Sequence, residues 1–475
     1  MDLTREAVRR WLAEHADTEE AAIVLRAWLA AGGEPELIAT AMSRWLSVFG
    51  RQELAAQVYA QWLQARGDLA AFAKPLLAWL AVNAQTPAAR LVLKAWLDGG
   101  GPVEPVREAL GCWIAAHGSD PQASLVYPPW LRAGGDLEFV APSMMDWLQA
   151  NSQGNSDVRM VLKAWLQAGG QPGVVRGHLR GWVQRNGAEA QARSLYRAWF
   201  VAGGEHGLVR EPLRAWLAEH GLGLAAQYIY PVWMEAGGEL ELIRDPLRGW
   251  LERHGTSEDA QFIYKAWLDR KGEIEFVRQA IAGWLSLHAH APAASFIYPA
   301  WLQAGGDPRF VAAPIADWLA KHAQREQDAR FVYGAWLDGG GEFDLVREPM
   351  RAWIETYGLI EAACFVYPPW LDAGGDLDLV REPIRSWLEQ HATVQDAQFV
   401  YRAWLEARGE IDLVREPIRE WLTQHARKKV ASFLYAAWLG SGGELGFMRA
   451  QIRAWLAARG GSEDGRFVCE AWLKA

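Results

Sequence analysis

Cysteine is scarce in this chain, and the scarcity excludes one class of fold. Among 475 residues there are 3 cysteines, Cys112, Cys364 and Cys469, which stand far apart without paired spacing. Disulfide frameworks and zinc fingers need cysteines in closely spaced sets. We therefore expect neither, and we expect a reducing, cytoplasmic location.

Long hydrophobic runs and excess positive charge are also missing. No apolar run approaches the roughly 18 residues that a membrane-spanning helix needs, and the charged N-terminus shows no signal peptide. The 48 Lys and Arg against 57 Asp and Glu give a net charge of -9. Nucleic-acid affinity depends on phosphate neutralisation by Lys and Arg. We therefore expect no membrane association and do not favour nucleic acid as the partner, although the total does not exclude a local basic patch.

Catalytic motifs are absent as well. No GxGxxG or P-loop follows a strand pattern, and neither HExxH nor GxSxG occurs. Acidic pairs recur at repeat positions, whereas catalysis needs one converging site. We expect no enzyme activity, no cofactor and no metal site.

Tryptophan, by contrast, is abundant and regularly spaced. The 28 tryptophans recur every 17 residues, with one extra residue between Trp147 and Trp165 and another between Trp318 and Trp336. They form two alternating classes, so the full repeat is 34 residues and occurs 14 times. This predicts one continuous array over residues 1–475, with one-residue insertions near 148–164 and 319–335.

Each repeat has two helical halves with different patterns. The first half, helix A, carries an apolar stripe with a polar back, as in Val414, Ile418 and Trp421. The second, helix B, has only a narrow polar line, such as Gln398, Arg402 and Glu406, on an otherwise apolar helix. We therefore expect an all-α, right-handed superhelical α-solenoid of 14 two-helix repeats with about 28 short helices. Helix B should be packed between its neighbours, and the back of helix A should face water.

Glycine and proline recur at fixed places in the repeat. In pairs such as Gly203-Gly204, the second glycine follows the helix B tryptophan by five residues and is expected to take positive φ at the helix end. The acid that usually follows is expected to cap the next helix. Prolines precede the tryptophan in many A helices and in some B helices. Either these helices continue with a kink, which we favour, or the helix begins later after an extended segment.

The polar line on helix B varies from repeat to repeat within a fixed frame, as expected for a surface that recognises a protein or peptide. The alternative is a solvated stripe with local ion pairs such as Lys265 with Asp269. The candidate partner-binding residues are Lys94, Asp98, Arg132, Lys163, Gln167, Arg197, Glu235, Lys265, Asp269, Gln303, Asp338, Arg402 and Glu406.

Arginine pairs on helix A form a second candidate, a basic ridge that could grip phosphates or an acidic partner. Neighbouring glutamates leave open an ion-pair ladder between repeats. The ridge consists of Arg210, Arg214, Arg244, Arg248, Arg347, Arg351, Arg381, Arg385, Arg415 and Arg419. Histidines four residues after the helix A tryptophan, and the tryptophan and tyrosine rings themselves, are expected to be structural.

The 34-residue helix–turn–helix period resembles tetratricopeptide-type α-solenoids over the whole chain. The residue pattern departs from that family, because the first helix reads Pro383-Ile384-Arg385-Ser386-Trp387-Leu388 where the family has Gly-x-x-Tyr. The resemblance implies a non-catalytic binding scaffold, such as the sensor or recognition array of a larger system. Two alternatives stay open: an RNA- or polyanion-binding repeat protein, in the manner of pentatricopeptide arrays, and an (α/α)-toroid enzyme.

Neither end of the array shows a polar capping helix, and solenoids generally need capped ends for solubility. We therefore expect either end-to-end self-association or a place within a larger protein.

Overall fold

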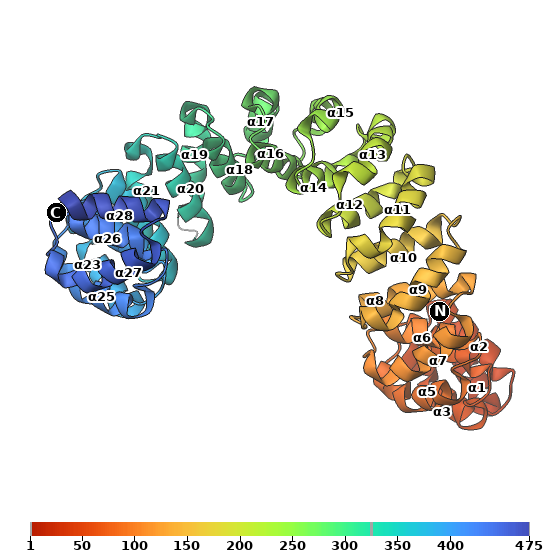
Figure 1. Ribbon diagram of the computed structural model, residues 1–475. Helices are drawn as coiled ribbons and strands as arrows, with labels where there is room; N and C mark the ends of the chain where they lie inside the picture. Colours follow the sequence, from red (N-terminus) through yellow and green to blue (C-terminus); the bar gives the residue numbers. More distant parts are fainter. Residues whose placement is uncertain (1, 324–325, 475) are drawn as a thin grey trace. The chain divides into compact units, whose positions relative to one another are not determined.

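The computed structural model describes residues 2–323 and 326–474, and it confirms an α-solenoid of 14 two-helix repeats (Figure 1). Within these ranges all regular structure is helical. The A helices are α1 (Asp2–His15), α3 (Pro35–Phe49), α5 (Leu69–Asn83), α7 (Arg107–His117), α9 (Leu137–Ala150), α11 (Pro172–Asn186), α13 (His206–His220), α15 (Leu240–His254), α17 (Ile274–His288), α19 (Pro308–His322), α21 (Phe343–Tyr357), α23 (Leu377–His391), α25 (Ile411–His425) and α27 (Leu445–Arg459).

The B helices are shorter and alternate with the A helices. They are α2 (Ala21–Ala30), α4 (Ala55–Gln64), α6 (Ala89–Asp98), α8 (Tyr127–Arg132), α10 (Ser156–Gln167), α12 (Arg193–Val201), α14 (Tyr230–Glu235), α16 (Ala260–Asp269), α18 (Ala294–Gln303), α20 (Glu326–Asp338), α22 (Tyr367–Asp372), α24 (Ala397–Glu406), α26 (Ala431–Gly440) and α28 (Glu463–Lys474). Five 3₁₀ turns precede some of the helices: η1 (Glu104–Val106), η2 (Pro121–Leu125), η3 (Ala190–Ala192), η4 (Leu224–Tyr228) and η5 (Glu361–Phe365).

The helices group into two compact units, residues 1–246 and 247–475, with the boundary inside α15. Within each unit, successive B helices pack against one another more extensively than successive A helices do. In the second unit α16, α18 and α20 form this tightly packed layer, with α17, α19 and α21 outside it (Figure 1). That the array is one continuous domain, and that it is right-handed, stay predictions.

The tryptophans form the core. All except Trp11, Trp28 and Trp472, which lie in the first and last repeats, are buried. The expected stripe of α25 is confirmed, because Val414 and Ile418 are buried with their tryptophan. Burying a large apolar side chain stabilises a fold by about 1.5–3 kcal/mol, so the repeated indoles account for much of the stability of each repeat.

The two tryptophan classes make different hydrogen bonds. A helix B indole donates to the carbonyl six residues later, as Trp199 Nε1 does to Glu205 at 3.1 Å. Most helix A indoles donate to a carbonyl 27 residues earlier, as Trp387 Nε1 does to Ile360 at 2.7 Å. Exceptions, with a buried Nε1 that has no partner among the described residues, are Trp113, Trp216 and Trp353. The B indole therefore fixes its own connecting loop, whereas the A indole joins its helix to the preceding repeat.

The glycine pair after helix B works differently from our expectation. In Gly203-Gly204 the first glycine, not the second, has positive φ, at +77°. A Cβ on Gly204 would lie 2.1 Å from Cε2 of Trp199. The second glycine is therefore required by the close approach of the indole rather than by backbone conformation. The first position tolerates side chains, because Arg66 and Lys271 hold positive φ there.

The acid after the glycine pair caps the next helix only where it is aspartate. Asp136 Oδ1 accepts from the backbone N of Glu138 at 3.0 Å, and Asp307 caps α19 in the same way. Glu34 and Glu205 make no side-chain cap. This matches the preference of the N-cap for short polar side chains, so the capping prediction was wrong for these glutamates.

Proline has different effects in the two layers. The A helices continue through it, as α13 does at Pro212, so the alternative of a late start is wrong for them, whereas the kink stays a prediction. Three B helices instead begin later, with Pro128, Pro231 or Pro368 in their first turn. The preceding residues form 3₁₀ turns rather than extended segments. Proline costs least in the first turn because its missing N–H would have no intrahelical partner there.

Only one of the two insertions lies fully within the described residues. Near 148–164, it coincides with a longer loop after α9 and with an α10 of 12 residues. The insertion near 319–335 includes residues 324–325, which lie outside the described residues.

Candidate binding face

The exposed line of helix B is shifted by one residue from the predicted line. In α24 the predicted member Gln398 is buried, with 5% of its surface exposed, whereas the adjacent Phe399 is 37% exposed. The line therefore runs through positions −5, −2 and +2 relative to the helix B tryptophan, in steps of three and four. Gln398 was the wrong residue for its first position, while Arg402 and Glu406 remain on the line.

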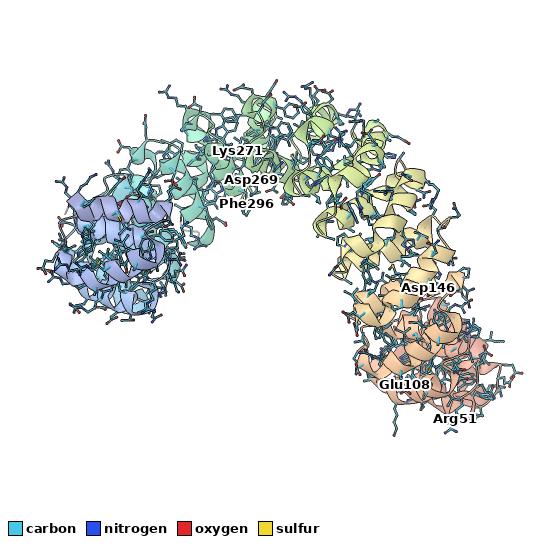
Figure 2. The ribbon with its side chains drawn as sticks, in the orientation of Figure 1. Arg51, Glu108, Asp146, Asp269, Lys271 and Phe296 are labelled. Atoms are coloured by element: carbon cyan, nitrogen blue, oxygen red, sulfur yellow. The ribbon has the colours of Figure 1, made fainter. Side chains whose placement is uncertain are left out.

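Position −5 is phenylalanine in every B helix of the second unit. These side chains are 37–58% exposed, and we call them the Phe row: Phe262, Phe296, Phe331, Phe365, Phe399, Phe433 and Phe467. Figure 2 shows Phe296 on the side of α18 away from α17. The rings of Phe365 and Phe399, which belong to consecutive repeats, lie 6.0 Å apart. From the sequence we expected these side chains to be buried.

Acidic and polar side chains run beside the Phe row at position +2. They are Asp269, Gln303, Asp338, Asp372 and Glu406. Arg402 approaches Asp372 at 3.7 Å and Glu406 at 3.6 Å. Burial raises the pKa of the Asp372 carboxyl; Arg402 opposes that rise, and nearby Asp338 adds to it. The second unit therefore presents an apolar row next to a row of mainly negative charge.

The predicted partner-binding residues all lie on the surface of the B layer. Ten of the thirteen are exposed, and Lys94, Lys163 and Arg402 are half-buried. Several pair with one another: Asp98 accepts from Lys94 and, across repeats, from Arg132 at 2.9 Å. Burial would raise the pKa of the Asp98 carboxyl, but these two hydrogen bonds outweigh it and the pKa is lowered. At these positions the contacts match the alternative of local ion pairs.

A pocket of about 1080 Å³ in the first unit gathers unpaired cations instead. Its wall includes Lys163 from α10, Arg193 and Arg197 from α12, and Tyr228 from η4. No carboxylate is among its described lining residues, and none of its three cations forms an ion pair with a described residue. The guanidinium of Arg193 lies over the Tyr228 ring, 5.5 Å from its centroid. We call this the basic pocket.

The charges of the basic pocket repel one another. Burial, followed by repulsion from Arg159, Arg132, Arg197 and Arg193, lowers the pKa of the Lys163 ammonium. Arg159 donates to the neutral hydroxyl of Ser194 at 2.9 Å, which leaves its charge uncompensated. Bringing like charges together costs free energy that an anion could recover.

The sequence analysis named Lys163 and Arg197 but missed Arg159 and Arg193. Both missed residues stand at position −6, four residues before a named cation. Basic residues at i and i+4 share one helix face, and the doublet occurs in two consecutive B helices. Comparing positions −6 and −2 across neighbouring repeats would have located the cluster.

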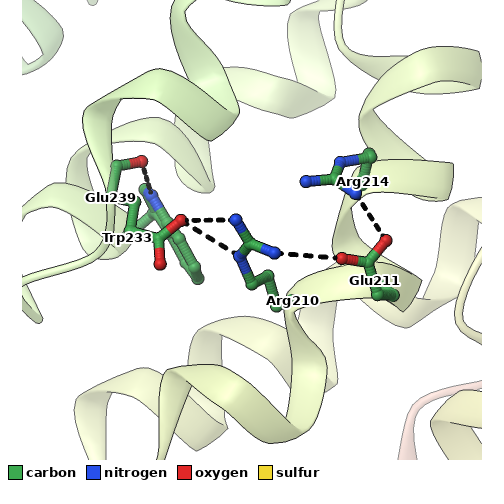
Figure 3. Close-up of polar contacts among 5 residues, drawn as sticks. All are labelled: Arg210, Glu211, Arg214, Trp233 and Glu239. Carbon is green, nitrogen blue, oxygen red and sulfur yellow. Dashed lines mark hydrogen bonds and ion pairs between the residues drawn. The ribbon is translucent and has the colours of Figure 1, made fainter.

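The basic ridge of helix A is neutralised by acids. Figure 3 shows Arg210 bonded to Glu239 of the next connecting loop and to Glu211, which also binds Arg214. Arg381 likewise pairs with Glu410 across 29 residues, at 2.9 Å. Within their own helices Arg244, Arg347, Arg351, Arg385 and Arg419 pair with acids, Arg415 pairs with Glu444, and Arg248 stacks on Phe276. The pairs of Arg210, Arg381 and Arg415 run between repeats, as in the ion-pair ladder that the sequence left open, whereas the other pairs lie within one helix.

Histidine and tyrosine connect backbone segments. His391 Nε2 lies 3.1 Å from the carbonyl of Leu359 in the preceding repeat, and five other histidines make the same contact across 32 residues. Tyr401 donates to the carbonyl of Ala392 at 2.8 Å, and most helix B tyrosines repeat this bond. These side chains are structural, as expected.

Across residues 2–323 and 326–474 no group of three or more His, Cys, Asp or Glu is placed to hold a metal ion. None of the described helices is both long enough and apolar enough to cross a membrane. No protein-family model matches the chain, and neither does any curated protein.

Proposed function

We propose that this chain is a non-catalytic scaffold that binds a protein or peptide partner along the exposed face of its B helices. The observation that carries the proposal is the Phe row, in which seven aromatic side chains occupy the same exposed position in consecutive repeats. Contiguous exposed apolar surface marks interaction sites, and aromatic side chains dominate the energy of most interfaces.

The acidic row beside these rings restricts the kinds of partner that fit the second unit. Asp269 and Asp338 are exposed, and only Asp269 has an ion-pair partner among the described residues, Lys265. A segment with apolar anchors and neighbouring Lys or Arg would satisfy both rows. Electrostatic complementarity of this kind sets specificity and association rate.

The two alternatives find less support. A polyanion needs a continuous run of free cations, whereas the arginines of helix A are engaged with acids. A toroid-type enzyme needs a pocket that gathers unlike titratable groups, whereas the basic pocket gathers cations. The free thiols of Cys112, Cys364 and Cys469 support a cytoplasmic location. Kinship with tetratricopeptide-type arrays rests on architecture alone.

Selection of peptides from a display library of random twelve-residue sequences, panned against the full chain, tests the proposal. The variant Phe296→Ser/Phe331→Ser/Phe365→Ser removes three adjacent members of the Phe row. The matched control removes three exposed apolar side chains from A helices: Val48→Ser, Val82→Ser and Leu287→Ser.

We expect enriched peptides to contain aromatic or aliphatic anchors with basic neighbours. They should bind the Phe-row variant at least about tenfold more weakly than the wild type, as for interface anchors, and bind the control variant unchanged. A library that yields no enrichment, or peptides that bind the Phe-row variant as well as the wild type, would show that this face is not the binding surface.

A further inference from the structure

The basic pocket of the first unit stands out in an acidic chain. Its three cations, Lys163, Arg193 and Arg197, and Arg159, which donates to Ser194 of its wall, come from two consecutive B helices. None of the four has an acid partner among the described residues. The arginines of helix A, by contrast, are held by carboxylates. Unlike the paired arginines of the basic ridge, these four cations have charge available for an anion.

The pocket also has an apolar side. Val201 is 73% exposed and Tyr228 is 46% exposed, and both belong to its wall. Gln167 and Ser194 add neutral hydrogen-bonding groups. The pocket therefore offers charge, hydrogen bonds and an aromatic surface within about 1080 Å³, a volume at the upper end of small-ligand sites.

We propose that the basic pocket binds an acidic segment of a polypeptide, with side-chain carboxylates or a phosphorylated side chain against Lys163, Arg193 and Arg197 and an apolar neighbour against Tyr228. Guanidinium groups suit both anions because they can bind two oxygens at once. The inference rests on the proposed peptide-binding role of the B face and assigns a partner chemistry to its first unit.

A polypeptide fits the surroundings better than RNA does. The cluster of four cations occupies two consecutive repeats, whereas the same layer carries Asp98 in an earlier repeat and Glu235 in the next. A nucleic acid carries a phosphate every few ångströms, so one that followed the layer would place phosphates against those acids. An acidic peptide can place its charges in the pocket alone.

Fluorescence anisotropy with labelled peptides tests the assignment on the full chain. One probe carries four glutamates around a leucine, a second replaces the glutamates by glutamines, and a third replaces one glutamate by phosphoserine. A single-stranded RNA of equal net charge is the fourth probe. The test variant is Lys163→Gln/Arg193→Gln/Arg197→Gln. The control, Arg214→Gln/Arg385→Gln/Arg419→Gln, removes the same charge from ion-paired exposed arginines.

We expect the glutamate or phosphoserine peptide to bind and the glutamine peptide to bind at least about tenfold more weakly. The triple variant should lose about a thousandfold in affinity, since each of its three charge-assisted contacts is worth about tenfold or more. The control variant should bind as the wild type does, and circular dichroism should show equal helicity. Whichever acidic probe binds tighter identifies the anion.

Equal binding of the glutamate and glutamine peptides, an unaffected triple variant, or tighter binding of RNA through the same residues would overturn the assignment. The Phe-row variant separates this failure from failure of the proposed function. If the display-selected peptides depend on the Phe row while the triple variant changes nothing, the peptide-binding face stands and the acidic-segment assignment falls.

Discussion

Substitution of Gly204 by alanine tests the packing of the repeat directly. A Cβ at this position would lie 2.1 Å from Cε2 of Trp199, whose ring is 1% exposed and has no free space to retreat into. The ring must move, and its hydrogen bond to the Glu205 carbonyl must lengthen or break. Overpacking costs about 1–3 kcal/mol, and a lost hydrogen bond costs about 1 kcal/mol. We therefore expect the loss in stability to be roughly 2–4 kcal/mol.

The adjacent Gly203 is the matched control. Its φ of +77° makes alanine costly in conformation, by about 1–2 kcal/mol, but an added Cβ would have no heavy atom within 4 Å. The same position accepts Arg408 in another repeat. Gly203→Ala should therefore lower the free energy of unfolding by less than Gly204→Ala does.

Hydrogen exchange of the segment covering α12 and its following loop provides the measurement, because repeat arrays need not unfold in one step. The double variant Trp199→Leu/Gly204→Ala removes the ring together with the clash. The loss of local opening free energy in the double variant should be smaller than the sum of the losses in the two single variants, because the effects of residues in contact are not additive. A Gly204→Ala protein whose local opening free energy equals that of Gly203→Ala would refute the close-approach argument.

Other consequences of the structure can be checked individually. Trp387→Phe should cost about 1–2 kcal/mol more than Trp353→Phe in local exchange stability, because Trp387 Nε1 donates to a carbonyl whereas Trp353 Nε1 is buried without a partner among the described residues; equal costs would contradict this. Asp376→Ala should destabilise α23 by about 1 kcal/mol through loss of its N-cap bond, measured by exchange of the first helical turn, and an unchanged turn would dismiss the cap. Burial raises the pKa of Tyr127 to about 12. The contribution of this buried, neutral phenol to the free energy of unfolding is therefore complete below the ordinary tyrosine pKa of about 10. That contribution is lost as the pH rises towards 12. Thermal unfolding followed above pH 10 should therefore show a melting temperature that falls more steeply for the wild type than for Tyr127→Phe, and equal slopes in the two proteins would argue against it.

The repeat and its helices could be predicted because one side chain marks each helix. Indoles at a fixed spacing can share one core only if their helices stack as repeats. The apolar stripe of Val414 and Ile418 then fixes which side of helix A faces that core. We predicted the wrong residue for the first position of the exposed line of helix B. Phe399 and Gln398 are adjacent, and hydrophobicity alone favours burial of the phenylalanine. Helix B is closed in by its neighbours on most sides, so the side that faces solvent depends on the packing between repeats. The sequence does not contain that geometry in any local pattern.

The basic pocket was missed for a related reason. Lys163 and Arg197 are ordinary surface residues when each is considered alone, and their effect depends on the distance between consecutive B helices. The arginine ridge was the stronger candidate from spacing, yet acids 29 residues further along the chain neutralise Arg210 and Arg381. The spacing of arginines along a helix therefore did not show which cations are free. That depends on whether the fold places an acid beside each cation.

Different positions of the repeat maintain the fold and form the proposed binding face. The indoles, the second glycine and the helix A histidines bond to backbone or pack on it. Positions −5, −2 and +2 of helix B contribute little to those contacts and are free to differ. In the second unit they combine phenylalanine with acids such as Asp338, and in the first unit they include the cations Lys163 and Arg197. A scaffold built this way can present apolar and acidic chemistry in one unit and basic chemistry in the other, and substitutions on the B face should alter binding without lowering stability.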